Sequence, residues 1–202
     1  MGERRPLIRP ARGDDIHAVA PLLYLTSPGG FNMFGGSERG GVRLIESAFK
    51  TPGTDSSRDV VWVAELDDDI AGVLAVFPAR EGDSRRDRFL RVALRRRAPW
   101  RWPGIRKVAR EGAARAPKPP ESSFYIDALA VSEDYRRRGV AAALLEHAEK
   151  LAREGGFDWL ALDTTASNTG ARALYERHGF EIGQEVPAAP PIPAMVGYVK
   201  RL

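Results

Sequence analysis

The segment IDALAVSEDYRRRGVAAALLEHA, residues 126–148, decides the fold of this 202-residue chain. It begins with apolar residues up to Val131, passes through a short polar loop and continues with apolar residues at helical spacing. This order predicts a strand that leads into the N-terminus of a helix. The first turn of a helix presents unpaired backbone N–H groups at the positive end of the helix dipole. Because Gly139 and Ala141 are small, a pyrophosphate could approach those amides closely.

Three consecutive arginines add positive charge to this loop: Arg136, Arg137 and Arg138. Guanidinium groups form bidentate hydrogen bonds with phosphates, so the segment is a candidate phosphate-binding site. A strand–loop–helix joint with a solvated arginine cluster would contain the same residues, and this alternative stays open. The segment is neither a Walker loop, which needs G-K-[ST], nor a dinucleotide-binding G-x-G-x-x-G.

Helices and strands alternate on both sides of this segment. We expect strands over 6–11, 60–66, 70–77, 124–131, 159–163, 180–186 and 195–201, and helices from Asp14 or Asp15 and over 38–50, 137–154 and 169–178. Residues 26–37 are expected to form a loop, 79–122 an irregular stretch and 187–193 a proline-rich connector. Pro21 is expected to kink the first helix or end it early. Together these elements predict an α+β (mixed α/β) domain over residues 1–202 with a mixed sheet.

The composition excludes several classes of site. The chain has no cysteine and three histidines, which excludes disulfide scaffolds, thiolate metal sites and cysteine nucleophiles, and makes a clustered histidine metal site unexpected. We therefore expect no metal. No apolar run approaches the roughly 20 residues that span a bilayer. The N-terminus MGERRPLIRP is charged and shows no secretory signal, so we expect a cytoplasmic protein.

Two motifs carry a resemblance to a known family. The first is L-A-V-x-x-x-Y-R-x-x-G-x-A, from Leu129 to Ala141; the second is N-x-x-A-x-x-x-Y-E-x-x-G-F, from Asn168 to Phe180. With the opening LIRPARGDD, they make the chain resemble the GNAT superfamily of acetyl-CoA-dependent N-acetyltransferases. The match is dense over 124–183, loose over 6–78 and absent over 79–122. It implies a mostly antiparallel sheet, flanked by helices and splayed between its fourth and fifth strands.

The resemblance also implies acetyl-CoA as cosubstrate and a role for particular residues. The backbone of Leu129 and Val131 would hold the pantetheine arm, the amides of residues 137–142 the pyrophosphate, and Tyr175 would be the general acid for the leaving thiolate. The implied cosubstrate-binding set is Leu129, Ala130, Val131, Arg136, Arg137, Arg138, Gly139, Val140, Ala141, Ala142, Asn168, Ala171 and Tyr175. Asn168 would hydrogen-bond the pantetheine. The alternative for Tyr175 is a core tyrosine with a satisfied hydroxyl, and Ala141 departs from the family's more frequent glycine.

A general base is sought on the strand over 124–131. Strict alternation places Ser123, Tyr125, Asp127 and Leu129 on one side and Phe124, Ile126 and Ala128 on the other. Asp127 is then the carboxylate that faces the site, and we take it as the candidate base, directly or through water. Its alternative is a structural aspartate. Glu65 and Asp163 are weaker candidates. Some members of the family have no side-chain base, so it also stays open that this chain has none.

Residues 80–118 form a basic insertion between the third and fourth strands. They hold 14 Lys and Arg against four Asp and Glu, a formal +10, which leaves −6 on the rest of a chain whose net charge is +4. The stretch RRDRFLRVALRRR can form a helix. Four interpretations stay open: a lid or packing helix, a surface for nucleic acid or an acidic partner, a peripheral membrane anchor with Trp100 and Trp102, and disorder.

The sequence thus predicts an N-acetyltransferase that moves an acetyl group directly to a primary amine of a small molecule or a protein. Phe31, Met33 and Phe34 are expected to line a partly apolar acceptor pocket or to anchor their loop. The alternatives are a non-catalytic acyl-CoA-binding regulatory module and an enzyme recruited to nucleic acid by its insertion. We expect a monomer or a homodimer.

Overall fold

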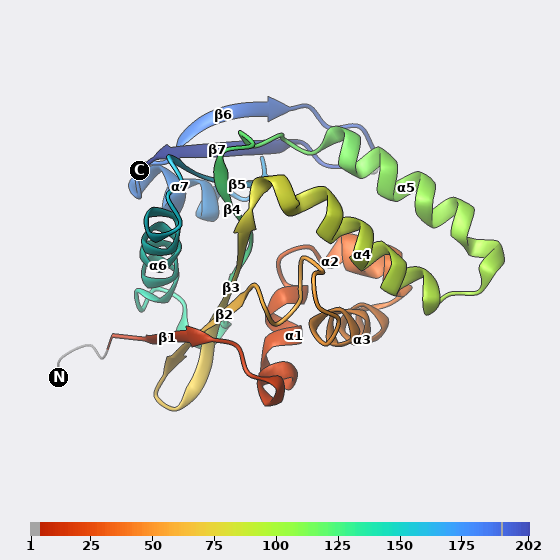
Figure 1. The fold of residues 1–202 in the computed structure, drawn as a ribbon, viewed down its shortest axis with the longest axis horizontal. Helices are drawn as coiled ribbons and strands as arrows, with labels where there is room; N and C mark the ends of the chain where they lie inside the picture. Colours follow the sequence, from red (N-terminus) through yellow and green to blue (C-terminus); the bar gives the residue numbers. More distant parts are fainter. Residues whose placement is uncertain (1–4, 191) are drawn as a thin grey trace.

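The computed structural model describes residues 5–190 and 192–202, and in this part of the chain seven strands form one sheet (Figure 1). The strands are β1 (Leu7–Pro10), β2 (Val61–Leu66), β3 (Asp69–Pro78), β4 (Ser123–Val131), β5 (Trp159–Thr165), β6 (Glu181–Val186) and β7 (Met195–Arg201). Their order is β1-β2-β3-β4-β5-β7-β6. Every neighbouring pair is antiparallel except β4 and β5. The predicted mixed, mostly antiparallel sheet is confirmed; residues 1–4 of the charged N-terminus and Pro191 of the connector lie outside the described residues.

Helices cover both faces of the sheet. They are α1 (Ile16–Tyr24), α2 (Pro28–Gly35), α3 (Glu38–Phe49), α4 (Gly82–Arg95), α5 (Trp102–Arg115), α6 (Val140–Glu154) and α7 (Thr169–Arg177). Figure 1 shows α6 and α7 on one side of the strands and α1 to α4 on the other. The alternation of side chains along β3 explains both layers, since Val73 and Ala75 pack with α1 whereas Leu74 and Val76 pack with α6.

Two helices are longer or more regular than the sequence predicts. Helix α1 continues through Pro21 to Tyr24, so the expected early end is wrong. The expected loop over 26–37 contains α2, which begins with Pro28 at its first position and ends at Gly36 with a φ of 84°. Proline and glycine therefore mark the ends of this helix rather than its absence. Phe31 and Phe34 fix the helix in place, because both rings pack edge-on against Phe89.

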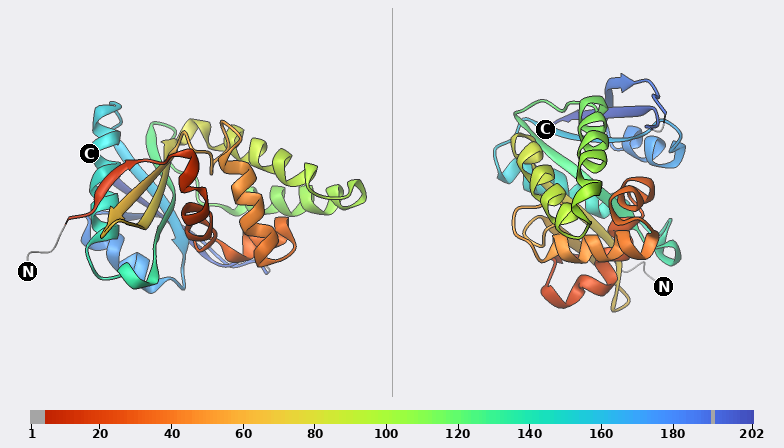
Figure 2. Two further views of the ribbon diagram at one scale, coloured as in Figure 1. Left: turned by 90° about the horizontal axis from the view of Figure 1, so that it is seen from below. Right: turned by 90° about the vertical axis from the view of Figure 1, so that its right-hand side faces the viewer.

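The expected irregular stretch over 79–122 is also wrong, because it contains α4 and α5. The apolar side of α4, with Phe89, Val92 and Ala93, packs on Leu44 and Ala48 of α3. Residues 85–95 of RRDRFLRVALRRR therefore lie in a helix as predicted, and its last two arginines follow the helix end. In contrast, α5 buries Ile105 alone. Figure 2 shows both helices extending past the rest of the molecule as an arm. The insertion is a structured arm whose first helix belongs to the core.

We predict that Phe89→Ala lowers the free energy of unfolding by about 3–5 kcal/mol, because it empties a buried aromatic site between α3 and α4. Trp100→Ala is the control: its side chain is 82% exposed, and its effect should stay within about 0.5 kcal/mol. Urea denaturation measures both. A Phe89 variant as stable as the wild type would show that α4 is not part of the core.

Candidate functional site

The sheet branches between β4 and β5. Their parallel pairing ends at Ile126 and Leu162, whereas β4 continues to Val131 and β5 to Thr165. The predicted splay between the fourth and fifth strands is therefore present. Beyond the branch, the backbone of Leu129, Ala130 and Val131 has no partner on β5. Unpaired strand edges of this kind can hydrogen-bond a ligand that lies between them.

A β-bulge at Asp127 lies at this branch. On β3, Ala75 pairs with Ala128 and Val76 with Ile126, so Asp127 is the extra residue of β4. The bulge shifts the alternation by one residue. Tyr125 and Ala128 consequently pack on the same face of the sheet, and Leu129 packs on the opposite one. The predicted alternation, with Tyr125 and Leu129 on one side and Ala128 on the other, is wrong.

Three half-buried carboxylates influence one another around the branch. Asp163, the first residue of β5 past the paired segment, accepts a hydrogen bond from the Tyr125 hydroxyl. Burial raises the pKa of Asp163, and it raises the pKa of Asp55 to about 6. The pKa of Asp127 is raised well above its usual range, first by burial and then by the charge of Asp55; the Arg86 guanidinium opposes this shift. The surroundings of the site therefore disfavour the ionised forms of these carboxyl groups.

The sequence singles out two of these carboxylates and misses the third. Asp55 lies in the turn TPGTDSS between α3 and β2, where an aspartate is ordinary turn chemistry, and no sequence signal distinguishes it. Arg86 belongs to α4, in the stretch that the family resemblance leaves unexplained. Glu65, the other weak candidate for a base, forms an ion pair with Arg9 instead.

Tyr175 is a core tyrosine with a free hydroxyl. Its side chain is 7% exposed, and its ring centroid lies 5.8 Å from that of Tyr198 and 6.0 Å from that of Phe180. Within the described residues the Tyr175 hydroxyl makes no hydrogen bond, unlike the satisfied hydroxyl of the structural alternative. Burial, and then the charge of Asp163, raise the pKa of Tyr175 to about 12. The phenol therefore keeps its proton at neutral pH and can donate it.

Asn168 caps helix α7. Its Oδ1 accepts the Ala171 N–H at 3.2 Å, and its Nδ2 donates to Thr164 Oγ1 at 3.3 Å. A cap of this kind fixes the start of the helix that carries Tyr175. Asn168 and Ala171 thus stand at the same end of α7.

The loop before α6 presents six free amides. Helix α6 begins at Val140 and not at residue 137, because Arg137 and Gly139 adopt left-handed φ angles of 60° and 77°. In the described part of the chain, no hydrogen bond is donated by the N–H groups of residues 137–142; the first is that of Ala143, to Gly139. Successive amides beside left-handed residues form an anion-binding concavity. They belong to the residues whose amides the family resemblance implies for the pyrophosphate: Arg137, Arg138, Gly139, Val140, Ala141 and Ala142.

The arginines of this loop differ in their partners. Arg138 forms an ion pair with Asp67 at 2.6 Å and lies 5.1 Å from the ring centroid of Tyr135. Arg136 lies 3.8 Å from Glu133. Arg138 therefore ties the loop to the β2–β3 turn, and among the described residues Arg137 has no ion-pair partner.

A pocket of about 300 Å³ opens beside the branch. Tyr125 and Asp163 line it, and residues 117–120 form one wall. This segment crosses β7 at Gly197, where a Cβ would lie 2.7 Å from that of Pro117, and its Lys118 N–H donates to Gln184 Oε1 at 2.9 Å. The end of the insertion therefore closes the pocket. Phe31 and Phe34, expected near the acceptor, are absent from its lining and anchor α2 instead.

Two kinds of feature are absent from residues 5–190 and 192–202. No group of three or more His, Asp or Glu side chains is arranged so that it could hold a metal ion. No helix in these ranges is both long and apolar enough to cross a membrane.

Comparison with known proteins gives a match to a family model and shorter matches to individual proteins. A model of the acetyltransferase (GNAT) family matches residues 39–180. Streptothricin acetyltransferase A of Bacillus subtilis (strain 168) is 43% identical over 58 residues, 29% of this chain and 34% of that protein. [Ribosomal protein bS18]-alanine N-acetyltransferase of Escherichia coli (strain K12) is 46% identical over 52 residues, 26% of this chain and 35% of that protein. The matches therefore span about a third of the length of these relatives.

Solved structures share the fold over nearly the whole chain. A crystal structure of an acetyltransferase superimposes with a TM-score of 0.72 at 20% identity and covers 96% of this chain and 98% of its own. An N-acetyltransferase from Staphylococcus aureus Mu50 superimposes with a TM-score of 0.68 at 18% identity, and the superposition covers 96% of this chain and 99% of that chain. At these identities the likeness concerns the fold alone.

We predict that Asp127→Asn stabilises the protein at pH 8 but not at pH 4. A raised pKa means that the folded chain keeps a proton that the unfolded chain loses, so the stability that protonated Asp127 provides is present at pH 4 and is lost as the pH rises through the raised pKa. We expect a gain of about 1 kcal/mol or more at pH 8, since one unit of pKa corresponds to about 1.4 kcal/mol. Urea denaturation at both pH values measures it.

The exposed Asp158→Asn is the matched control and should change stability by less than about 0.5 kcal/mol at either pH. If the Asp127 variant differed from the wild type equally at pH 4 and pH 8, the raised pKa would be contradicted.

Proposed function

The chain belongs to the acetyltransferase (GNAT) family, and from this membership we propose that it moves an acetyl group from acetyl-CoA directly to a primary amine of a small molecule or a protein. One observation carries the proposal. Strand β4 leads from the half-buried carboxylates at the branch, past an unpaired strand edge, to six free amides at the start of α6. A thioester at one end of this path and a pyrophosphate at the other match the two ends of the acetyl-pantetheine arm of acetyl-CoA.

The cosubstrate would be held mainly by backbone groups. The amides of residues 137–142 would bind the pyrophosphate, and the backbone of Leu129, Ala130 and Val131 would pair with the pantetheine arm. Arg137 is free to reach a phosphate, whereas Arg138 supports the loop through Asp67. Asn168 and Ala171 would contribute from the start of α7.

The acceptor would enter the pocket beside Asp163. Its volume of about 300 Å³ lies at the lower end for small-molecule sites, which suits a small amine or a single amine-bearing side chain or terminus. Carboxylates that are poorly solvated attract a protonated amine. The names of the relatives include streptothricin and a ribosomal-protein alanine as acetylated groups, so both kinds of acceptor remain candidates.

In the proposed reaction the amine must first lose a proton. We assign this step to Asp127, whose raised pKa brings its affinity for a proton closer to that of the amine. The amine nitrogen then attacks the thioester carbon, the new C–N bond forms and the C–S bond breaks. Backbone N–H groups near Leu129 or Ala130 would stabilise the negative carbonyl oxygen. Tyr175 would give its proton to the departing sulfur, and the second proton that the nitrogen loses on becoming an amide would return to the Tyr175 oxygen. The absence of cysteine favours direct transfer.

We further propose that residues 1–202 work as one domain in the cytoplasm, as a monomer or a homodimer. The basic insertion contributes the Arg86 charge from α4 and, through residues 117–120 after α5, a pocket wall, which supports its role as a structural part of the enzyme. Because the insertion also exposes positive charge, recruitment to nucleic acid or to an acidic partner is a second candidate role for it.

We predict that Tyr175→Phe and Asp127→Asn change the rate of acetyl transfer in different ways. Tyr175→Phe should lower kcat about 100-fold or more at every pH, because a general acid contributes about 10²–10⁴-fold, while the KM for acetyl-CoA stays within about twofold. Asp127→Asn should instead remove the rise of kcat/KM with pH that follows ionisation of Asp127. Thiol release with a panel of amine acceptors measures both.

Tyr24→Phe is the matched control for the lost hydroxyl, since Tyr24 lies in the core against α3 and donates to Asn32. It should keep near-normal kcat. An unchanged pH–rate profile in the Asp127 variant would remove Asp127 as the base, and normal kcat in the Tyr175 variant would remove Tyr175 as the acid.

We predict that Gly139→Ala weakens acetyl-CoA binding about tenfold. Gly139 has a φ of 77°, where a Cβ costs about 1–2 kcal/mol, and relief of this strain would turn the adjacent amides away from the pyrophosphate. Gly156→Ala is the matched control, because Gly156 has a φ of 72° and its Cβ would also meet nothing within 4 Å. Both variants should lose similar stability, but calorimetry should show weaker acetyl-CoA binding for Gly139→Ala alone. Equal affinities would contradict the phosphate site.

A further inference from the structure

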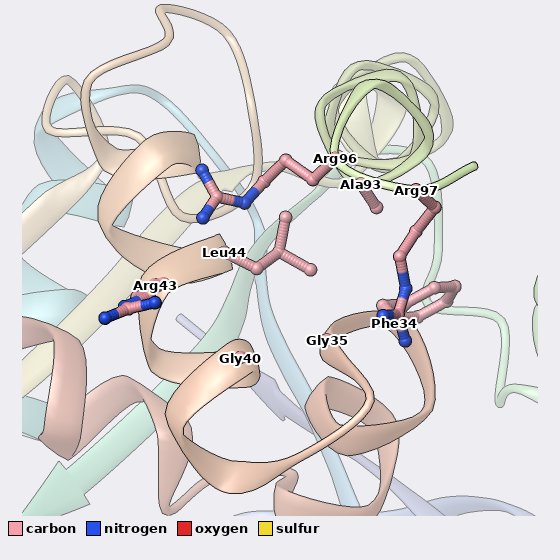
Figure 3. A pocket seen from close by; sticks show the side chains of 8 residues that line it. All are labelled: Phe34, Gly35, Gly40, Arg43, Leu44, Ala93, Arg96 and Arg97. Carbon is pink, nitrogen blue, oxygen red and sulfur yellow. The ribbon is translucent and has the colours of Figure 1, made fainter.

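A second hollow lies away from the branch, between α2, α3 and the end of α4 (Figure 3). Its volume is about 130 Å³, and its lining includes Phe34, Gly35, Gly40, Leu44, Arg96 and Arg97. None of these residues belongs to the proposed acetyl-CoA or acid–base groups. The hollow combines an apolar wall, formed by Phe34 and Leu44, with two guanidinium groups.

Arg97 has donors without acceptors. Its Nε is buried and makes no hydrogen bond, and within residues 5–190 and 192–202 its guanidinium forms neither a hydrogen bond nor an ion pair. Figure 3 shows this side chain extending from the end of α4 toward Phe34 and Gly35. Buried donors in native proteins are almost always satisfied, so an unpaired charged donor at a hollow needs an explanation.

The position of Arg97 is fixed from two sides. The turn after α2 passes directly beneath the guanidinium at Gly36, where a Cβ would collide with Nη1 and Nη2. On the other side, the Trp102 indole N–H donates to the carbonyl oxygens of Leu94 at 3.0 Å and Arg97 at 3.1 Å. The backbone that carries Arg97 is thus anchored, and its donors are held at the hollow.

Arg96 adds positive charge on the other side of the hollow, since Figure 3 shows its guanidinium directed away from that of Arg97, with Leu44 between them. Its Nη1 donates to Ser47 Oγ at 2.8 Å, and it has no carboxylate partner among the described residues. Arg43 borders the same hollow from α3. The three arginines favour an anion in the hollow.

We propose that this hollow binds a small oxyanion, a carboxylate or a phosphate, through the guanidinium group of Arg97. The planar donor fork of arginine matches both groups bidentately. The volume exceeds by about tenfold the 10–15 Å³ that one water needs, which admits a small anion. A short apolar body on the ligand would rest against Phe34 and Leu44.

The test follows the Nε–Hε NMR signal of Arg97, assigned by its loss in Arg97→Lys, during titration with sodium phosphate or sodium acetate at constant ionic strength. Saturating acetyl-CoA is present so that the α6 loop does not compete. We expect a saturable shift with at least one of the two probes, and none with chloride. The stronger probe identifies the source of the oxyanion.

Affinities of the variants are then measured by calorimetry with the stronger probe. Arg97→Lys keeps the charge without the fork and should weaken binding about tenfold, whereas Arg96→Gln removes a more distant charge and should weaken binding less. The exposed Arg101→Gln, which changes the charge of the same arm outside the hollow, should change it by less than about twofold. No saturable shift with either probe, or an equal loss in the Arg101 variant, would overturn the proposal.

Discussion

The parallel pairing of β4 with β5 lasts for only four residue pairs, and the candidate site depends on where it stops. After Ile126 the bulge at Asp127 turns β4 away from its partner, so the next residues of both strands lose their hydrogen-bond partners on one edge. The same turn directs β4 toward the loop before α6, with its free amides. The bulge thus separates β4 from β5, places the Asp127 carboxyl at the branch and directs β4 toward the free amides of the α6 loop.

This arrangement leaves poorly solvated charge at the branch. Asp55, Asp127 and Asp163 come from a turn, a bulge and a strand end, and burial raises the pKa of each. Arg86 of the inserted helix α4 offsets part of that charge, and residues 117–120 at the far end of the insertion close the pocket. The insertion therefore belongs to the site at both of its ends, although its middle extends away from the molecule.

Sequence patterns predict those parts of the structure that local chemistry determines. Free amides at the start of α6 follow from a strand that ends before small residues at a helix start. Helix α2 and the bulge at Asp127 could not be predicted in this way. The first is stabilised by contacts of Phe31 and Phe34 with Phe89, more than 50 residues away, and the second exists only relative to its partner strand β3.

The central claim is that acetyl-CoA lies in the branch with its pyrophosphate on the α6 loop. A crystal structure of the protein with acetyl-CoA tests this most directly. The account predicts pyrophosphate oxygens within about 3.2 Å of several N–H groups of residues 137–142, and the thioester between Asp127 of β4 and the free end of β5. Acetyl-CoA bound elsewhere, or a thioester far from Asp127 and Tyr175, would contradict it.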